Sequence, residues 1–175
     1  MNYSEIKNFD IANGLGVRVS LFVSGCRNAC PGCFNPSTWD FAAGSLFTEA
    51  VEDGLLKMLE PSYVRGLTLL GGEPFEPENQ RVLLPFLERV RRERPEKDVW
   101  CFSGFTFEEM QSGASRCCTA DTEPMLALID VLVDGRFVAG KKDISLRFRG
   151  SSNQRILDVP ASLKAGTPVA WQSIP

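Results

Sequence analysis

Three cysteines, Cys26, Cys30 and Cys33, stand in a C-x3-C-x2-C arrangement within one short loop. Thiolates at this spacing can wrap around one metal centre, and Gly25 and Gly32 let the loop backbone turn tightly. An iron–sulfur cluster with four irons commonly takes four thiolates, so three local cysteines leave one iron without a protein ligand. A metal centre that binds a substrate needs such an open position. The spacing therefore predicts a cluster with one open iron.

The other possible ligands restrict the choice. The chain has no histidine, which removes Ser-His and Cys-His catalytic arrangements and every zinc site that needs imidazole. Cys101, Cys117 and Cys118 could join the loop in a structural zinc site, although they form no second C-x2-C pair. Clustering in a Gly/Pro loop disfavours cysteines that merely fill a core, and a reducing compartment disfavours a disulfide framework.

A second group with chemical potential is the turn Gly71-Gly72-Glu73-Pro74, which follows an apolar run. Two glycines permit close approach of the backbone to a ligand. The backbone carbonyls and the Glu73 carboxylate can accept hydrogen bonds from an ammonium group. The same residues also suit an ordinary strand-to-helix turn, so the motif points to function only together with the cysteine loop.

The elements that must position these residues alternate between strands and helices. Apolar and β-branched runs predict strands at Val17–Val23, Leu67–Leu70, Val99–Phe102 and Val131–Val133. Helical signals predict a helix from an N-cap at Thr48 to about Leu59, one through Leu83–Val90 with Pro85 near its start or at a kink, and a short one with a Thr106–Glu109 capping box. Residues 112–122 predict a loop. The alternation favours an α/β fold with a mainly parallel sheet, in a single domain spanning residues 1–175.

In such sheets, ligands gather at the carboxyl ends of the strands. The cysteine loop, the Gly71-Gly72 pair, Ser103-Gly104 and Asp134-Gly135 each follow a predicted strand. We therefore expect them to share one edge of the sheet and to form one site, although Asp134-Gly135 also suits a plain turn.

Composition excludes several classes of function. Apolar residues make up 43% and charged residues 23% of the chain, as in globular proteins with a hydrophobic core. The net charge of −3 gives no support to nucleic-acid binding. No apolar run reaches the length of a membrane span, and the polar first residues lack the form of a secretory signal. We expect a cytoplasmic protein that binds neither nucleic acid nor membrane.

Several segments spread over almost the whole chain carry a family resemblance: Asp10-Ile11, Asn13-Gly14, Leu21–Cys26, Cys30–Cys33, Asn35, Ser37–Trp39, Gly71–Pro74, Val131–Phe137 and Arg149–Gln154. They resemble the activating proteins of anaerobic ribonucleoside-triphosphate reductase, within the radical S-adenosylmethionine superfamily. Two positions depart from the usual pattern. Many superfamily members have an aromatic residue where this chain has Gly32, with Phe34 close by, and this family tends to have Asp where Glu73 stands.

The resemblance implies a glycyl-radical activase with a partial (βα) barrel of the radical S-adenosylmethionine type. It implies that Cys26, Cys30 and Cys33 bind a [4Fe-4S] cluster. It further implies a set of residues that bind S-adenosylmethionine: Gly32, Cys33, Phe34, Gly71, Gly72, Glu73, Pro74 and Asp134. Within this set, the turn at Glu73 would hold the ammonium group of the methionine part, and Phe34 would pack on the adenine.

The implied reaction is reductive cleavage of S-adenosylmethionine to methionine and a 5′-deoxyadenosyl radical, which takes a hydrogen atom from a glycine of the partner. By resemblance, the partner is the glycyl-radical subunit of anaerobic ribonucleoside-triphosphate reductase, and the electron donor is a flavodoxin. Two alternatives stay open. One is a radical enzyme with a small-molecule substrate, similar to deazaguanine synthases, and the other is a non-catalytic structural metal module. The Arg149–Gln154 segment is either a partner contact or a solvated loop, and the Cys117-Cys118 loop, which looks like an insertion, has no assigned role.

Overall fold

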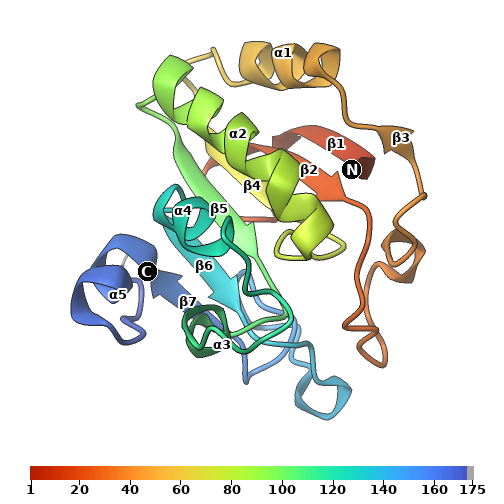
Figure 1. The fold of residues 1–175 in the computed structure, drawn as a ribbon, viewed down its shortest axis with the longest axis vertical. Helices are drawn as coiled ribbons and strands as arrows, with labels where there is room; N and C mark the ends of the chain where they lie inside the picture. Colours follow the sequence, from red (N-terminus) through yellow and green to blue (C-terminus); the bar gives the residue numbers. More distant parts are fainter. Residues whose placement is uncertain (173–175) are drawn as a thin grey trace.

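A computed structural model describes residues 1–172, which contain a seven-stranded sheet (Figure 1). The strands are β1 (Asn2–Asp10), β2 (Val17–Val23), β3 (Ser45–Leu46), β4 (Val64–Gly71), β5 (Asp98–Phe102), β6 (Val131–Asp134) and β7 (Arg155–Asp158). Their order across the sheet is β3-β1-β2-β4-β5-β6-β7. The α-helices of the described residues are α1 (Glu49–Met58), α2 (Pro77–Glu93), α3 (Phe107–Gln111), α4 (Thr122–Ala127) and α5 (Val159–Ala165).

The four central strands are parallel, and the outer strands are antiparallel to their neighbours. β2, β4, β5 and β6 pair side by side in one direction, whereas β1, β3 and β7 run against their partners. The α/β class is confirmed, and the expected parallel arrangement holds for the centre of a mixed sheet. The carboxyl ends of the central strands point to one edge, where long loops gather at the bottom of Figure 1.

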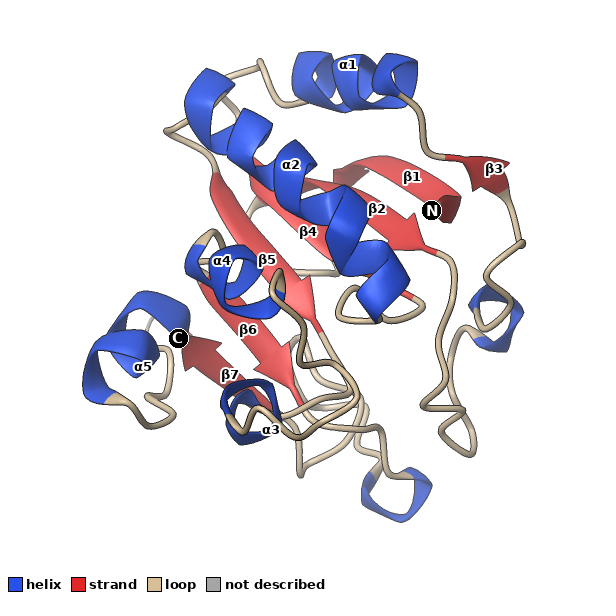
Figure 2. Ribbon diagram, viewed as in Figure 1, coloured by secondary structure: helices blue, strands red, loops and turns tan. Residues whose placement is uncertain are grey.

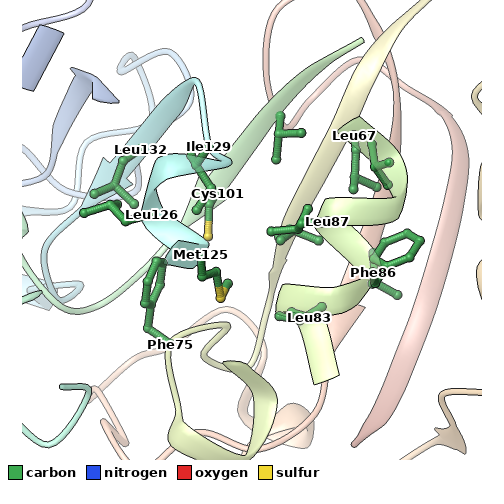
Figure 3. Close-up of a cluster of buried hydrophobic side chains, with 14 of the residues drawn as sticks. Leu67, Phe75, Leu83, Phe86, Leu87, Cys101, Met125, Leu126, Ile129 and Leu132 are labelled. Carbon is green, nitrogen blue, oxygen red and sulfur yellow. The ribbon is translucent and has the colours of Figure 1, made fainter. Parts of the chain in front are cut away.

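The helices α2 and α4 cover one face of this sheet (Figure 2). α2 buries Leu83, Phe86, Leu87 and Val90, whose spacing of three and four residues places them on one side of the helix. Figure 3 shows Leu83, Phe86 and Leu87 of this row beside Met125 and Leu126 of α4, with the strands behind. The helices and this face of the sheet thus form one hydrophobic core.

The opposite face of the sheet carries a second, smaller cluster around Trp100. The Trp100 ring meets the rings of Phe148 at 5.4 Å and Trp171 at 4.8 Å, both edge to face. Arg18 lies fully buried beside it, with Nη2 paired to Asp98 at 2.6 Å. A buried guanidinium needs such a partner because its charge has left water. This cluster fills the second face below the carboxyl ends of the strands.

Most predicted elements are present, with some differences at their ends. β2 has the predicted bounds, and α3 has the predicted capping box between Thr106 and Glu109. α2 begins at Pro77, so a start near Pro85 is wrong; Pro85 lies inside the helix on its exposed side, where a lost backbone hydrogen bond faces water. The pattern did not predict β1, β7, α4 or α5. None of the helices in residues 1–172 combines the length and apolarity needed to cross a membrane.

Candidate functional site

A cavity of about 420 Å³ lies at the carboxyl ends of the parallel strands. Its floor consists of Phe22, Leu70 and Phe102, from β2, β4 and β5. Each of them follows a residue that faces the helices, and Phe22 and Leu70 are partners in register. The floor therefore belongs to the face of the sheet away from α2 and α4. The volume lies within the range of roughly 300–1,000 Å³ that is usual for small-molecule sites.

The loops that follow the central strands meet at this cavity, as expected from a parallel sheet. The strand-end residues that line it are Gly71, Gly72, Ser103, Gly104 and Gly135. Gly72 lies especially close to the cysteine loop, because a Cβ added there would stand 2.6 Å from the carbonyl oxygen of Gly25. Only glycine permits this approach.

The three cysteines of the loop, Cys26, Cys30 and Cys33, all line the cavity as free, partly exposed thiols. Ala29 helps to direct them there, since its φ of 44° places a tight left-handed bend inside the loop. Within residues 1–172, no three Cys, His, Asp or Glu side chains converge on a single metal ion.

Without a metal, the surroundings of the cysteine loop keep the Cys26 and Cys30 thiols protonated. Burial raises the pKa of the Cys26 thiol to about 11, and the nearby Glu73 carboxylate adds to this shift. Burial also raises the pKa of the Cys30 thiol. A metal ion reverses this balance, because it stabilises the thiolate directly. The donor set therefore fits an iron–sulfur cluster.

Glu73 is a buried junction between three loops. Its Oε1 accepts hydrogen bonds from Phe75 N at 3.0 Å and from Ser103 Oγ at 2.7 Å. Its Oε2 accepts from Asn28 Nδ2 at 2.9 Å and from Gly104 N at 2.7 Å. Burial nevertheless raises the pKa of Glu73 to about 7. Protein donors thus occupy the carboxylate that we expected to receive an ammonium group.

A second buried carboxylate, that of Glu76 at the start of α2, binds Arg27 of the cysteine loop. Its Oε1 accepts from Arg27 N at 2.8 Å, and its Oε2 accepts from Arg27 Nη1 at 2.7 Å. Arg116 reaches the same carboxylate at 3.1 Å and donates to Asn28 Oδ1 at 3.0 Å. The loop that carries Cys117 and Cys118 therefore braces the cysteine loop through Arg116.

Phe34 forms part of the cavity wall, and its ring packs edge to face against Phe137 at 5.4 Å. It remains 64% exposed, so its ring is free to contact a ligand. Gly32 does not line the cavity. Its φ of 77° instead requires glycine to keep the loop in shape.

The structure does not bring Pro74 or Asp134 to the cavity. Pro74 is buried behind the turn. The Asp134 carboxylate is fully buried, accepts a hydrogen bond from Phe107 N at 2.8 Å, and pairs with Arg155. Its contacts tie β6 to α3 and β7.

The remaining cysteines lie elsewhere. Cys101 belongs to the hydrophobic core beside Ile129, as Figure 3 shows. The Cys117 thiol is buried against the same core, and the Cys118 thiol lies 3.2 Å from the carbonyl oxygen of Glu109. None of the three lines the cavity, so the structure does not join them to the cysteine loop.

Four residues that line the cavity were not among the predicted ligand-binding residues, namely Asn13, Asn28, Trp39 and Arg149, whereas Ser103 was expected at this edge of the sheet. Trp39 and Arg149 both belong to segments that carry the family resemblance. That resemblance was the available signal, but it could not say which side chains face inward.

Comparisons with known proteins agree with this site. Residues 12–157 match a family described as a 4Fe-4S single cluster domain. A protein of Pasteurella multocida is 46% identical over 160 residues, covering 89% of this chain and 96% of its own length. One of Haemophilus influenzae is 43% identical over 158 residues (89% and 97%), and one of Escherichia coli K12 is 42% identical over 156 residues (88% and 96%). All three are named anaerobic ribonucleoside-triphosphate reductase-activating protein. The chain belongs to this family of activating enzymes, which carry an iron–sulfur cluster domain.

Proposed function

We propose that this protein generates a glycyl radical on an anaerobic ribonucleoside-triphosphate reductase by reductive cleavage of S-adenosylmethionine. The observation that carries the proposal is the single cavity in which three free thiols face the Gly71-Gly72 turn above an apolar floor. The names of the relatives support the same partner. A flavodoxin-type protein is the proposed source of electrons, in a cytoplasm that keeps the thiols reduced.

In this proposal, Cys26, Cys30 and Cys33 bind the [4Fe-4S] cluster and leave one iron open. The carbonyl groups of Gly71 and Gly72 take the ammonium group of the methionine part. The adenosyl part rests on the floor of Phe22, Leu70 and Phe102, with Phe34 at its side. These are apolar rings and a Leu side chain that suit a flat, weakly polar base.

Glu73, Gly32, Pro74 and Asp134 act as positioning residues. Glu73 holds three loops together through four hydrogen bonds, and Asp134 anchors the end of β6. Residues 1–172 form one radical S-adenosylmethionine domain, in which the seven-stranded sheet is a partial barrel. Its open side admits the glycine loop of the reductase.

A [4Fe-4S] cluster held by Cys26, Cys30 and Cys33 would supply the electron for reductive cleavage of S-adenosylmethionine, and the 5′-deoxyadenosyl radical so formed would take a hydrogen atom from a glycine Cα of the reductase, leaving methionine as the second product. The chain's own residues orient the cofactor, and the apolar floor of the cavity keeps water away from it. A hydrogen-atom transfer needs no general base, which is consistent with a chain that has no histidine.

The test is anaerobic formation of 5′-deoxyadenosine by reduced, cluster-loaded protein with S-adenosylmethionine. The wild type and Cys118→Ser should form it, and Cys30→Ala should not. Cys118 is a matched control because it is a free cysteine outside the cavity. No product from wild-type protein with a full cluster would contradict the proposal and favour a structural metal module.

A further inference from the structure

The segment Arg149–Gln154 forms a fixed turn at the edge of the cavity. The Gln154 side chain closes this turn, because its Oε1 accepts hydrogen bonds from Gly150 N at 2.8 Å and from Ser151 N at 3.2 Å. Its Nε2 donates to the carbonyl oxygen of Gly135 at 2.9 Å, directly after β6. Arg149, Gly150 and Gln154 all line the cavity. The segment is therefore part of the site rather than a solvated loop.

Arg149 is the one lysine or arginine in the cavity lining of the described residues. Its Nη1 donates to the carbonyl oxygen of Gln154 at 3.1 Å, but its Nε is buried without a hydrogen-bond partner. No ion pair within residues 1–172 joins Arg149 to a carboxylate. Burying a charged donor without an acceptor costs free energy. A ligand that supplies an acceptor to Arg149 would therefore bind favourably here.

The cavity offers no acidic side chain of its own to meet this arginine. Glu73 is the one acidic residue in the described lining, and four protein donors occupy its carboxylate. The cavity therefore presents a cation that lacks an anion. The ligand proposed above carries one carboxylate, on its methionine part.

We propose that Arg149 binds the α-carboxylate of S-adenosylmethionine, an inference that rests on the proposed function. A carboxylate has two oxygens and several acceptor positions, so it can accept N–H bonds from Arg149 and keep further acceptor positions available to other groups in the cavity. Gln154 is a positioning residue, since it fixes the turn that carries the guanidinium. Arg149 thereby selects the intact amino acid over analogues without the carboxylate.

The experiment measures dissociation constants of cluster-loaded protein for S-adenosylmethionine and for decarboxylated S-adenosylmethionine, by competition against labelled S-adenosylmethionine. Arg149→Met should raise the dissociation constant for S-adenosylmethionine by roughly tenfold or more, as expected for a lost charged hydrogen bond. The dissociation constant for the decarboxylated analogue should change by less than about twofold, because the group that Arg149 binds is already absent. Arg149→Lys should fall between the wild type and Arg149→Met.

Arg147→Met is the matched control, because Arg147 is exposed, lies outside the cavity lining and contacts the Phe148 ring at 5.5 Å. It should bind both compounds as the wild type does. Thermal unfolding of all variants separates loss of binding from loss of fold. The assignment is overturned if Arg149→Met binds S-adenosylmethionine as tightly as the wild type, or loses the same factor for both compounds.

The same preparations distinguish this result from failure of the proposed function. If the wild type binds S-adenosylmethionine and forms 5′-deoxyadenosine while Arg149→Met binds equally well, only the arginine assignment is lost. A wild type that neither binds nor cleaves S-adenosylmethionine contradicts the proposed function, and the assignment with it.

Discussion

Asn28 Nδ2 donates a hydrogen bond to Glu73 Oε2 over 2.9 Å, and this contact joins the cysteine loop to the turn after β4. The same carboxylate accepts hydrogen bonds from the Ser103 hydroxyl and the Gly104 N–H, and both residues follow β5. Loops after three neighbouring parallel strands therefore meet on one buried group. The position of the thiols relative to the glycine turn depends on this junction as much as on the cysteine spacing.

The junction should make the stability of the cluster-free protein depend on pH. The folded-state pKa of Glu73 is raised to about 7 from the ordinary value of 4.5, so the folded protein holds the proton more tightly than the unfolded chain. Its contribution is fully present below about pH 4.5 and is lost as the pH rises through about 7, by an amount on the order of 3 kcal/mol. Urea unfolding of wild type and Glu73→Gln at several pH values measures this loss as a difference between the two.

Glu88→Gln provides the control, because Glu88 is exposed on α2 and should leave the pH dependence of the wild type intact. Parallel curves for wild type and Glu73→Gln between pH 5 and 8 would show that Glu73 does not titrate in this range.

Gly72→Ala should destabilise the fold and lower cluster content. The new Cβ would stand 2.6 Å from the Gly25 carbonyl oxygen and 3.0 Å from that of Thr38, which costs roughly 1–3 kcal/mol for an overpacked site. Gly54→Ala in α1 is the opposite case, since nothing lies within 4 Å of its new Cβ. It should stabilise the protein by roughly 0.5–1 kcal/mol. Urea unfolding that gives both variants the same sign would refute this account of the turn.

Arg116→Ala should speed the loss of iron to a chelator. The change leaves the buried Glu76 carboxylate and the Asn28 side chain each without one partner. The expected factor lies between about twofold and tenfold, because the arginine is partly exposed while the carboxylate is buried. Arg92→Ala, at a residue whose one ion pair is exposed and 3.5 Å long, should release iron at the wild-type rate. Equal rates for wild type and Arg116→Ala would show that Arg116 does not brace the cysteine loop.

Serine variants of four cysteines should fall into two classes by iron and sulfide analysis. Cys26→Ser, Cys30→Ser and Cys33→Ser should hold less than about one iron per chain, because each removes a cluster ligand. Cys118→Ser should keep about four irons, since its thiol contacts backbone carbonyl groups outside the cavity. A full cluster in Cys30→Ser, or loss of it in Cys118→Ser, would reassign the ligands.

The sequence predicted the centre of the fold well because β2, β4, β5 and β6 are apolar runs buried on both faces. Because parallel strands end at one edge of the sheet, the sequence also predicted that the loops after these strands meet there. β1 gave no such pattern, because it lies near the edge of the sheet and exposes polar residues such as Glu5 and Asn8. β7 has only four residues.

Within the site, the sequence predicted the cluster ligands but not the contacts that hold the site in place. The spacing of Cys26, Cys30 and Cys33 is a local property, so it was visible in the sequence. The occupied carboxylate of Glu73 depends on donors up to 45 residues away, and the inward position of Arg149 depends on the contact between Gln154 and Gly135. Such long-range contacts follow from the packing of the strands, which local patterns do not specify.

The central claim is that the 5′-deoxyadenosyl group takes its hydrogen from a glycine of the reductase. The most direct measurement combines this protein, loaded with its cluster and reduced, with S-adenosylmethionine and a reductase that carries deuterium on the glycine Cα. We predict an organic radical on the reductase by electron paramagnetic resonance, together with deuterium in the 5′-deoxyadenosine. Formation of 5′-deoxyadenosine without deuterium and without a radical on the reductase would contradict the account.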